Sequence, residues 1–381
     1  MADFHLNVEP RDAVISRDGR PFGAAPGGRM KGLDWLFPSV LAGSLRTLLG
    51  KQAGGNFDEA MVTDLKAVEV AGPLMAVGHE LYLPAPKDFI LRELPDRAGF
   101  AARPVAGLGA ACDLPEGLEP VLLPEAAGDD FKPGKAPAFW SVTQMGSWLA
   151  SATGEGFATP LEKKPVGFSA APEKEDRYHS AIEAVSGTAE EGKLFKTVGL
   201  AFAQGTAMAA RVRCAEQSRL KGSLQNLNVL HPLGGERRLA SFQSGSAVHW
   251  GCPDSVRGKL QGAKLVRMVL ATPAIFEHGW KPGWLDENWL GSPPGSELSL
   301  RLVGAAVERW RPVSGWSLER GKAGAKAVRR VVPAGSVYFF EVEGAADGRT
   351  LAERWLEAVS DDPQDQRDGF GLAVWGVWQR H

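Results

Sequence analysis

Cysteine is scarce in this chain of 381 residues, and its three occurrences follow no pattern. Cys112, Cys214 and Cys252 lie far apart, whereas a zinc site needs paired ligands and a disulfide framework needs an even number of cysteines. The sequence therefore argues against both classes of protein. We expect buried or incidental thiols, and no metal ion or other cofactor.

Long apolar segments are also missing. The longest uncharged run, from Thr197 to Ala210, contains threonine, glutamine and two glycines and is too short to span a bilayer. The first residues, MADFHLNVEPRD, lack the basic segment and apolar core of a secretory signal. We expect a cytoplasmic protein with no membrane contact.

The chain has almost no net charge, −2 at pH 7, but its charges are unevenly distributed. The segment from Phe57 to Asp130 carries fourteen acidic and five basic residues, whereas Lys193 to Lys221 carries six basic and one acidic. A neutral molecule with one basic face is expected, and such a face suits a polyanion, although a solvated patchwork of charges explains the pattern nearly as well.

The most one-sided segment runs from Arg309 to Phe340, with seven basic residues and one glutamate. Trp310 and Trp316 lie among the charges, and small residues separate the cations. Closely spaced cations can reach phosphates, and tryptophans can stack on unpaired bases. The segment indicates either a nucleic-acid contact or a solvated surface hairpin.

Hydrophobic periodicity predicts the main elements. An apolar stripe with period 3.6 predicts a helix from Pro38 to about Gly50. A capping box, Thr350 to Glu353, predicts another helix that ends before Pro363. Further helices are expected over 139–150 and 253–260, and strands over 4–8, 66–77, 81–91, 194–203, 209–214, 263–271, 297–310, 335–343 and 370–378.

This order of elements predicts an α+β protein with two ferredoxin-like, RRM-like domains of the βαββαβ type. The expected N-terminal domain covers residues 1–192 and carries an insertion at about 84–137, where proline, glycine and acidic residues dominate. The C-terminal domain covers 193–381.

Two loops combine glycine with arginine. Arg17 and Arg20 flank Asp18 and Gly19, either as a simple turn or as a phosphate contact. In the second loop, 234–238, two glycines permit a tight turn, and the two arginines that end the loop suit bidentate phosphate bonds or a surface ion pair with Glu236 before them.

The sequence contains no clear catalytic motif. No HExxH, GxSxG or Walker motif occurs, and the histidines are scattered. His179 is the histidine to watch, because Arg177 and Tyr178 beside it suit a loop that faces RNA.

Six blocks in order resemble one family. They are EPRDAVISRDGRPFG with FPSVLAGSLRTLLG, SGTAEEGKLFKTVGLAF, LGGERRLASF, LATPAIFEHGWKPGWL, GWSL with RRVVPAGSVYFFE, and GFGLAVWGVW. They resemble the RAMP-superfamily third subunit of the type III-B CRISPR effector, the Cmr module. The resemblance covers nearly the whole chain and is weakest from Pro84 to Pro137.

The resemblance implies a non-catalytic subunit that binds the repeat-derived 5′ tag of the guide RNA, the crRNA. It also implies contacts with the large polymerase-palm subunit and with a backbone RAMP subunit. Family motifs and local chemistry together give the candidate RNA-binding residues: Arg17, Arg20, Phe22, Arg46, Lys164, His179, Lys193, Gly234, Gly235, Arg237, Arg238, Lys322, Lys326, Arg329, Arg330, Gly369 and Gly371.

Three alternatives stay open. The chain could be a RAMP endoribonuclease that processes the guide precursor through His179, the equivalent subunit of another type III complex, or a scaffold whose basic patches meet acidic protein surfaces. Loss of cleavage with intact binding after mutation of a catalytic histidine would favour the first.

Overall fold

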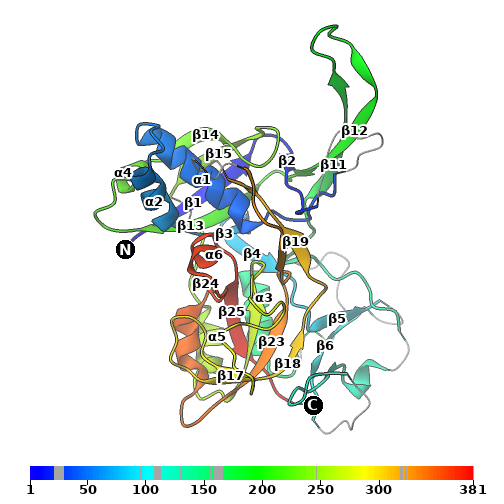
Figure 1. Ribbon diagram of the computed structural model, residues 1–381. Coiled ribbons are helices and arrows are strands. Elements are labelled where there is room, and N and C mark those ends of the chain that lie inside the picture. The colour runs from blue at the N-terminus through cyan, green and yellow to red at the C-terminus, as the bar shows by residue number, and fades with distance from the viewer. Residues whose placement is uncertain are drawn as a thin grey trace.

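The computed structural model describes residues 1–20, 30–93, 97–106, 113–128, 131–154, 157, 166–245, 247–317, 321 and 324–380. Two antiparallel sheets lie one above the other in Figure 1, and a long hairpin projects from the upper half. The expected mixture of helices and antiparallel strands is confirmed. None of the helices within these ranges is long and apolar enough to cross a membrane.

The first sheet has eight strands. At its centre, strands from the first 77 residues lie next to strands from residues 206–244. The strand at the N-terminus pairs antiparallel with β13 on one side and β15 on the other. In spatial order the strands are β10 (Phe168–Ser169), β9 (Phe139–Ser141), β4 (Glu80–Pro84), β3 (Glu69–Val77), β13 (Thr206–Cys214), β1 (Ala2–Pro10), β15 (Leu239–Ser244) and β14 (Asn228–Pro232).

Helix α1 (Pro38–Gln52) covers this sheet, as the apolar stripe predicts. Proline at its first turn suits the fixed backbone angle there, and Leu41, Leu45 and Leu49 are fully buried. Helix α2 (Glu59–Ala67) was missed. Its N-cap is Asp58, whose carboxylate accepts the amide of Met61 at 2.8 Å, a cap within an acidic, weakly periodic segment.

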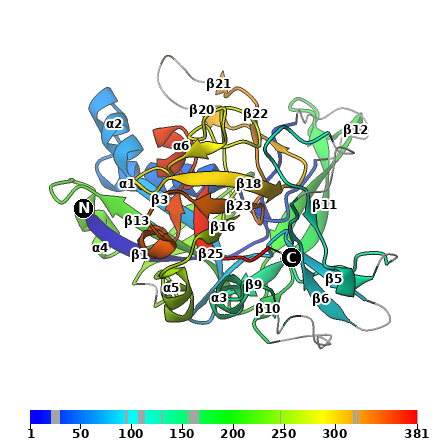
Figure 2. The same ribbon diagram turned by 90° about the horizontal axis from the view of Figure 1, so that it is seen from below.

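The second sheet has six strands in the order β17 (Leu290–Gly291), β18 (Leu300–Ala306), β23 (Val337–Val342), β16 (Leu265–Leu270), β25 (Leu372–Val377) and β24 (Glu357–Ala358). Helices α3 (Val142–Ala150) and α5 (Asp254–Leu260) lie side by side against β25 (Figure 2). Helix α4 (Lys221–Gln225) is a short turn of helix that contacts α1.

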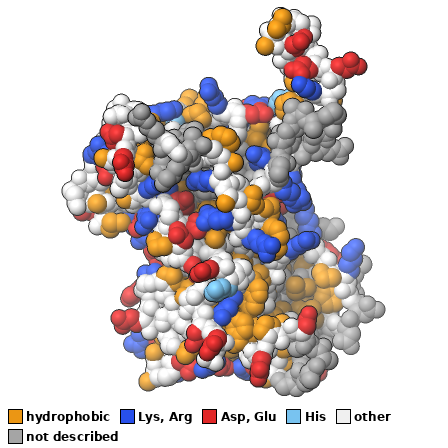
Figure 3. Space-filling model, in the orientation of Figure 1, with side chains coloured by type: hydrophobic (Ala, Val, Ile, Leu, Met, Phe, Trp, Pro, Cys, Tyr) orange, Lys and Arg blue, Asp and Glu red, His pale blue; other side chains and the backbone are white. Residues whose placement is uncertain are grey.

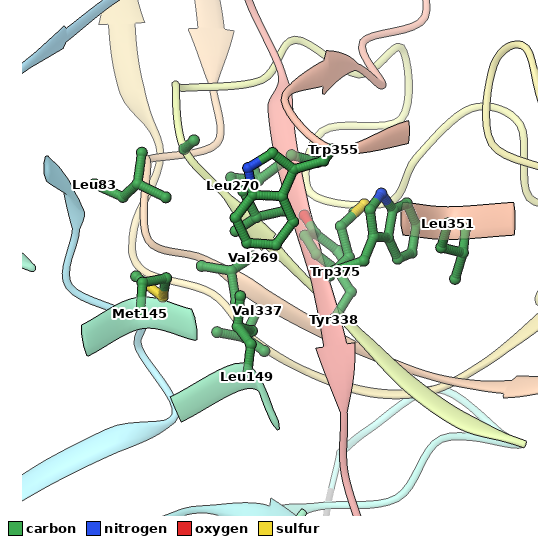
Figure 4. Close-up of a cluster of buried hydrophobic side chains, with 14 of the residues drawn as sticks. Leu83, Met145, Leu149, Val269, Leu270, Val337, Tyr338, Leu351, Trp355 and Trp375 are labelled. Atoms are coloured by element: carbon green, nitrogen blue, oxygen red, sulfur yellow. The ribbon is translucent and has the colours of Figure 1, made fainter. Parts of the chain in front are cut away.

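One large hydrophobic core joins the two sheets. Leu83 of β4 and Leu149 of α3 lie in it with Val269, Val337 and Trp375 of the second sheet (Figure 4). Strands β13 to β15 follow residue 192 yet belong to the first sheet, and residue 192 itself lies within β12 (Ala189–Ala201). The sheets therefore divide the chain nearer residue 250 than at the predicted boundary.

The expected insertion forms short strand pairs beside the core. These are β5 (Phe89–Arg92) with β6 (Ala98–Ala101) and β7 (Arg103–Pro104) with β8 (Val121–Leu122), followed by the 3-10 helix η1 (Glu125–Ala127). Asp88 holds the insertion to the body, because its carboxylate accepts bonds from Arg103 and from Arg267 of β16. All three side chains are fully buried.

The predicted capping-box helix is wrong in its details. The segment Gly348–Arg354 forms the 3-10 helix η2, and its N-cap is Asp347, which lies three residues before Thr350. A separate helix, α6 (Pro363–Arg367), begins where a stop was expected, because Asp362 caps it and Pro363 suits a first helical position.

Candidate nucleic-acid interface

The basic segment forms two consecutive antiparallel strand pairs, which we call the double hairpin. Strand β19 (Arg311–Val313) pairs with β22 (Arg329–Val331), and β20 (Trp316–Ser317) pairs with β21 (Gly324–Ala325). Val313 and Val331 are buried in a small core with Phe37 and Phe370, which fixes the base of the hairpin. The charged side chains therefore project from a rigid support.

Several cations on this hairpin are free to bind a ligand. Arg309, Lys326 and Arg330 form no ion pair with any other residue in the described ranges. The guanidinium of Arg330 lies 4.7 Å from the ring centre of Trp310. Trp310 is 44% exposed and Trp316 is 67% exposed. Together they form a surface of cations and flat aromatic rings, and blue and orange side chains meet in this region of Figure 3.

The loop of Arg17 and Arg20 lies directly against this hairpin. The amide of Gly19 donates to the carbonyl of Pro312 at 3.0 Å, and a side chain at Gly19 would meet the backbone of Val313. Asp18 is buried, accepts the amide of Arg20 at 3.1 Å and pairs with its guanidinium at 2.9 Å. The turn and the phosphate hypothesis are thus compatible, because the turn holds both arginines on the surface.

Arg329 is less available than its neighbours. Its guanidinium makes two parallel bonds to the buried carboxylate of Asp365 in α6, at 2.7 and 2.8 Å. This bidentate pair ties the hairpin to α6, so Arg329 positions the hairpin more than it offers free charge.

The glycine turn at Gly234 and Gly235 packs against the segment that leads into Arg17. The amide of Gly235 donates to the carbonyl of Ile15 at 2.8 Å, and a side chain at Gly234 would lie 2.4 Å from that carbonyl oxygen. Arg237 has the left-handed backbone angle φ of 52°, which is uncommon for a residue with a side chain, and it is exposed without an ion pair in the described part of the chain.

Arg238 is neutralised by two carboxylates. It pairs with Asp12 and, at 3.2 Å, with Glu236. Asp12 also binds Arg177 at 2.8 Å. Hydrogen bonds from Arg177, and then those from Ala13 and Arg238, outweigh burial and lower the pKa of Asp12. Arg238 therefore belongs to an ion cluster with Asp12, Glu236 and Arg177, in which its charge is balanced by carboxylates.

His179 and Lys193 lie on the projecting hairpin of β11 (Glu173–Ile182) and β12. The Nε2 atom of His179 is 2.8 Å from the hydroxyl of Thr197, and its ring stacks on Phe195 at 5.2 Å. Lys193 pairs with Glu190 three residues earlier. The Nε2 atom of His179 also lies 3.9 Å from the carboxylate of Glu236 in the glycine turn.

Three candidates from the family pattern have structural roles, and of these Gly369 and Gly371 are buried and Arg46 is largely buried. Arg46 pairs with Asp368 and donates to the carbonyls of Val68, at 2.7 Å, and Arg367, at 3.1 Å. Gly369 and Gly371 have positive φ, and a side chain there would meet the carbonyl oxygen of Val70 or the side chain of Ser360. This loop packs between the two sheets, so its glycines allow close approach of protein backbone rather than of a surface ligand.

Three candidates, Phe22, Lys164 and Lys322, lie outside the described residues. Sequence reasoning missed the cluster of Asp12 and Arg177, because the residues around Arg177 were expected to form a loop rather than a strand. The side chains of β11 alternate between exposed and half-buried in the structure, but its polar sequence shows no apolar alternation from which the strand could have been predicted.

The surface carries side chains of the kinds that bind phosphates and stack on bases. Over the described ranges, no group of three or more His, Cys, Asp or Glu side chains could hold a metal ion. What is brought together is two loops of cations, Arg17 to Arg20 and the double hairpin, with two exposed indole rings. Phosphate contacts and base stacking are the interactions that such groups make.

A family model described as CRISPR-associated protein (Cas_Cmr3) matches residues 6–378. The chain belongs to this family. The family assignment made from the six sequence blocks is thereby confirmed. No curated protein matches the chain.

The solved structures to which this Cas_Cmr3 chain is similar are distant from it. A chain of the type III-B Cmr-beta complex bound to cognate target RNA and AMPPnP has 13% identity and a TM-score of 0.46 over 88% of this chain and 86% of that one. A chain of the Csm3–Csm4 subcomplex of the type III-A interference complex has 9% identity and a TM-score of 0.41 over 90% and 94%. The family assignment rests on the family model alone.

Proposed function

We propose that this Cas_Cmr3 chain is a non-catalytic subunit of a type III-B CRISPR interference complex that binds and caps the 5′ repeat-derived tag of the guide RNA. The observation that carries the proposal is the double hairpin with its free cations and exposed tryptophans, packed against the loop of Arg17 and Arg20. The membership in the family supports a place in such a complex.

The chemistry of the surface favours single-stranded RNA. Lys326, Arg309 and Arg330 can neutralise backbone phosphates, and Trp316 offers an open ring face for a splayed base. Each stacked base contributes about 1–3 kcal/mol by alanine substitution. Because the hairpin base is packed and tied to α6, the described part of the hairpin base is fixed before RNA arrives, which reduces the entropic cost of binding.

The same proposal includes two protein neighbours, the large polymerase-palm subunit and the first backbone RAMP subunit. The family resemblance of the sequence supports this part of the proposal.

Crosslinking tests the RNA site directly. We expect photoreactive bases in the tag of an assembled complex to crosslink to peptides that contain Arg17 to Arg20 or the segment 309–330. Crosslinks to spacer nucleotides only, or to other parts of this chain, would move the subunit away from the tag.

Quantitative binding adds a matched comparison. We expect Lys326→Ala/Arg330→Ala to weaken tag binding and to reduce the salt dependence of log K by roughly 0.7 for each lost phosphate contact. The control Arg257→Ala/Lys259→Ala removes two exposed cations from α5 and should leave both quantities unchanged. Equal effects of the two double variants would contradict a localised site.

The non-catalytic part of the proposal has its own test. The ring of His179 is stacked on Phe195 and bonded to Thr197, an arrangement that suits a structural role. We expect His179→Ala to leave processing of guide precursor by the assembled complex unchanged. Loss of cleavage with intact RNA binding would favour the endoribonuclease alternative instead.

A further inference from the structure

A polar cavity of about 350 Å³ lies between the two sheets. Strands β3 and β13 of the first sheet line one side of it, and β24 with parts of η2 and α6 lines the other, where these elements meet in Figure 1. Pockets that bind small molecules have volumes of about 300–1,000 Å³. None of the residues that we expect to bind RNA lines this cavity.

The side chains that line the cavity carry a net positive charge. Four arginines and two glutamates are among them, which leaves a charge of +2. These residues are Arg211, Arg213, Arg354, Arg367, Glu69 and Glu357. A concave site with charge of one sign concentrates the electrostatic field inside it, so the cavity attracts an anion.

The two glutamates neutralise the arginines of β13. Arg211 and Arg213 each donate to the carboxylate of Glu357 in β24 at 2.7 Å, and Arg213 also pairs with Glu69 of β3 at 2.9 Å. These bonds join the two sheets and form one wall of the cavity. Both carboxylates are therefore already engaged.

Arg354 and Arg367 have no carboxylate partner in the described part of the chain. The guanidinium of Arg354 donates to the carbonyl of Pro294 at 2.7 Å, and that of Arg367 donates to the amide oxygen of Gln364 at 3.2 Å. A side chain at Gly295 would come within 2.7 Å of the guanidinium of Arg354, so the glycine leaves room for it. Both arginines are half-buried, where an unbalanced charge costs more free energy than on open surface.

Two of the arginines also have a hydrogen-bond donor without an acceptor. The Nε atoms of Arg211 and Arg367 are buried, and neither donates to any atom of the described residues. The side chain of Arg211 is only 11% exposed. A buried donor without an acceptor is unfavourable, so the lining favours a ligand that is rich in oxygen atoms.

Phosphate matches both the charge and the donors. A phosphate monoester carries a charge of about −1.5 to −2 at pH 7, and its three free oxygens accept the paired N–H groups of guanidinium. A single carboxylate would balance only half of the unpaired charge. The volume of the cavity also leaves room beside the phosphate for ordered water or for a small organic group.

We infer that this cavity binds the phosphate group of a small molecule, either inorganic phosphate or a phosphate monoester. Arg354 and Arg367 supply the charge that the ligand balances, and Arg211 lies in the wall beside them. The inference goes beyond the proposed function, because it concerns a second anion site that is separate from the RNA surface of the double hairpin.

Two variants test the cavity. Arg354→Gln/Arg367→Gln removes both unpaired charges and keeps polar side chains, and Ala358→Glu adds a carboxylate to the lining without removing an arginine. The control Arg257→Gln/Lys259→Gln removes two exposed cations from α5. Circular dichroism and thermal unfolding without phosphate establish that each full-length variant is folded.

Isothermal titration calorimetry measures the binding of sodium phosphate and of glycerol phosphate at one ionic strength, which is set with sodium chloride. We expect one saturable site in the unmodified chain and in the control. Both cavity variants should bind at least about tenfold more weakly, because a hydrogen bond to a charged group is lost or opposed. Tighter binding of inorganic phosphate would identify the free ion as the ligand, and tighter binding of glycerol phosphate would identify a monoester.

The outcomes separate this site from the RNA site. Absence of saturable phosphate binding, or equal affinities in the cavity variants and the control, overturns the inference. Phosphate binding that is lost in Lys326→Ala/Arg330→Ala but kept in the cavity variants also overturns it, since the phosphate would then lie on the double hairpin. If Lys326→Ala/Arg330→Ala has no effect on tag RNA while the cavity variants lose phosphate, the proposed tag-binding function fails and the phosphate site stands.

Discussion

Replacing Asp88 by asparagine should destabilise the protein strongly while barely changing its shape. The carboxylate of Asp88 accepts bonds from Arg103 at 2.8 Å, from Arg267 at 2.6 Å and from the indole of Trp148 at 3.0 Å. Asparagine has nearly the same volume, so Asp88→Asn removes the charge and leaves no cavity. Two buried guanidinium groups would then lack their shared counter-ion.

The magnitude follows from burial. Desolvation, and then the adjacent charge of Arg267, already lower the pKa of Arg103 to about 9 with Asp88 in place. The charged form of Arg103 is therefore disfavoured in the folded protein even when its counter-ion is present. Removal of one partner from a buried ion pair costs about 3–5 kcal/mol. We expect a loss in the upper part of this range, because one carboxylate serves two arginines, and a fall in Tm of about 5 °C.

Thermal unfolding followed by tryptophan fluorescence measures the effect, since Trp148 packs directly on both guanidinium groups. Glu343→Gln is the matched control, because it removes a half-exposed carboxylate that binds Arg301 at 2.6 Å. We expect the control to cost less than about 1 kcal/mol. A change for Asp88→Asn no larger than that for Glu343→Gln would refute the reasoning.

Three further predictions follow from side-chain environments. Asp365→Asn should break the bidentate tie between Arg329 and α6, so the base of the hairpin is less ordered and tag RNA binds more weakly in an affinity measurement. Hydrogen bonds from Arg177 lower the pKa of Asp12 in the folded protein. The stability that this carboxylate contributes is therefore present above pH 3.8 and is lost as the pH falls through the lower pKa of the folded state. Below that pKa, hydrogen exchange of backbone amides should rise at the base of β11 and β12. Burial raises the pKa of Cys252 to about 11, so a thiol reagent at pH 8 should modify this residue only after denaturation, as peptide mapping would show.

The strongly periodic elements could be predicted from the sequence, because a buried stripe leaves a local signal. The helix from Pro38 and the strands that end in Val77, Leu270 and Val377 appear close to their expected bounds. Helix α2 and strand β11 could not, since their polar, charged sequences show no apolar stripe and their ends depend on single caps or on pairing with distant strands.

The candidate site was predictable in part. The basic hairpin and the turn after Arg17 were recognised from composition and turn chemistry, which are local properties. That Arg46, Arg238 and Arg329 are neutralised was not visible, because their partners, Asp368, Asp12 and Asp365, lie from 36 to 322 residues away along the chain. A sequence pattern shows that an arginine is present but not which carboxylate the fold brings to it.

The sequence by itself determined the class of fold, the family and the uneven distribution of charge, because periodicity, motif order and composition are properties of the chain. Only the tertiary structure decided which cations remain free. It placed Lys326, Arg330 and Arg237 at the surface without ion pairs to other described residues, and it buried the glycine loop between the sheets. The physical reason is that ion pairing and burial depend on distances in space, and folding brings together residues that no local pattern connects.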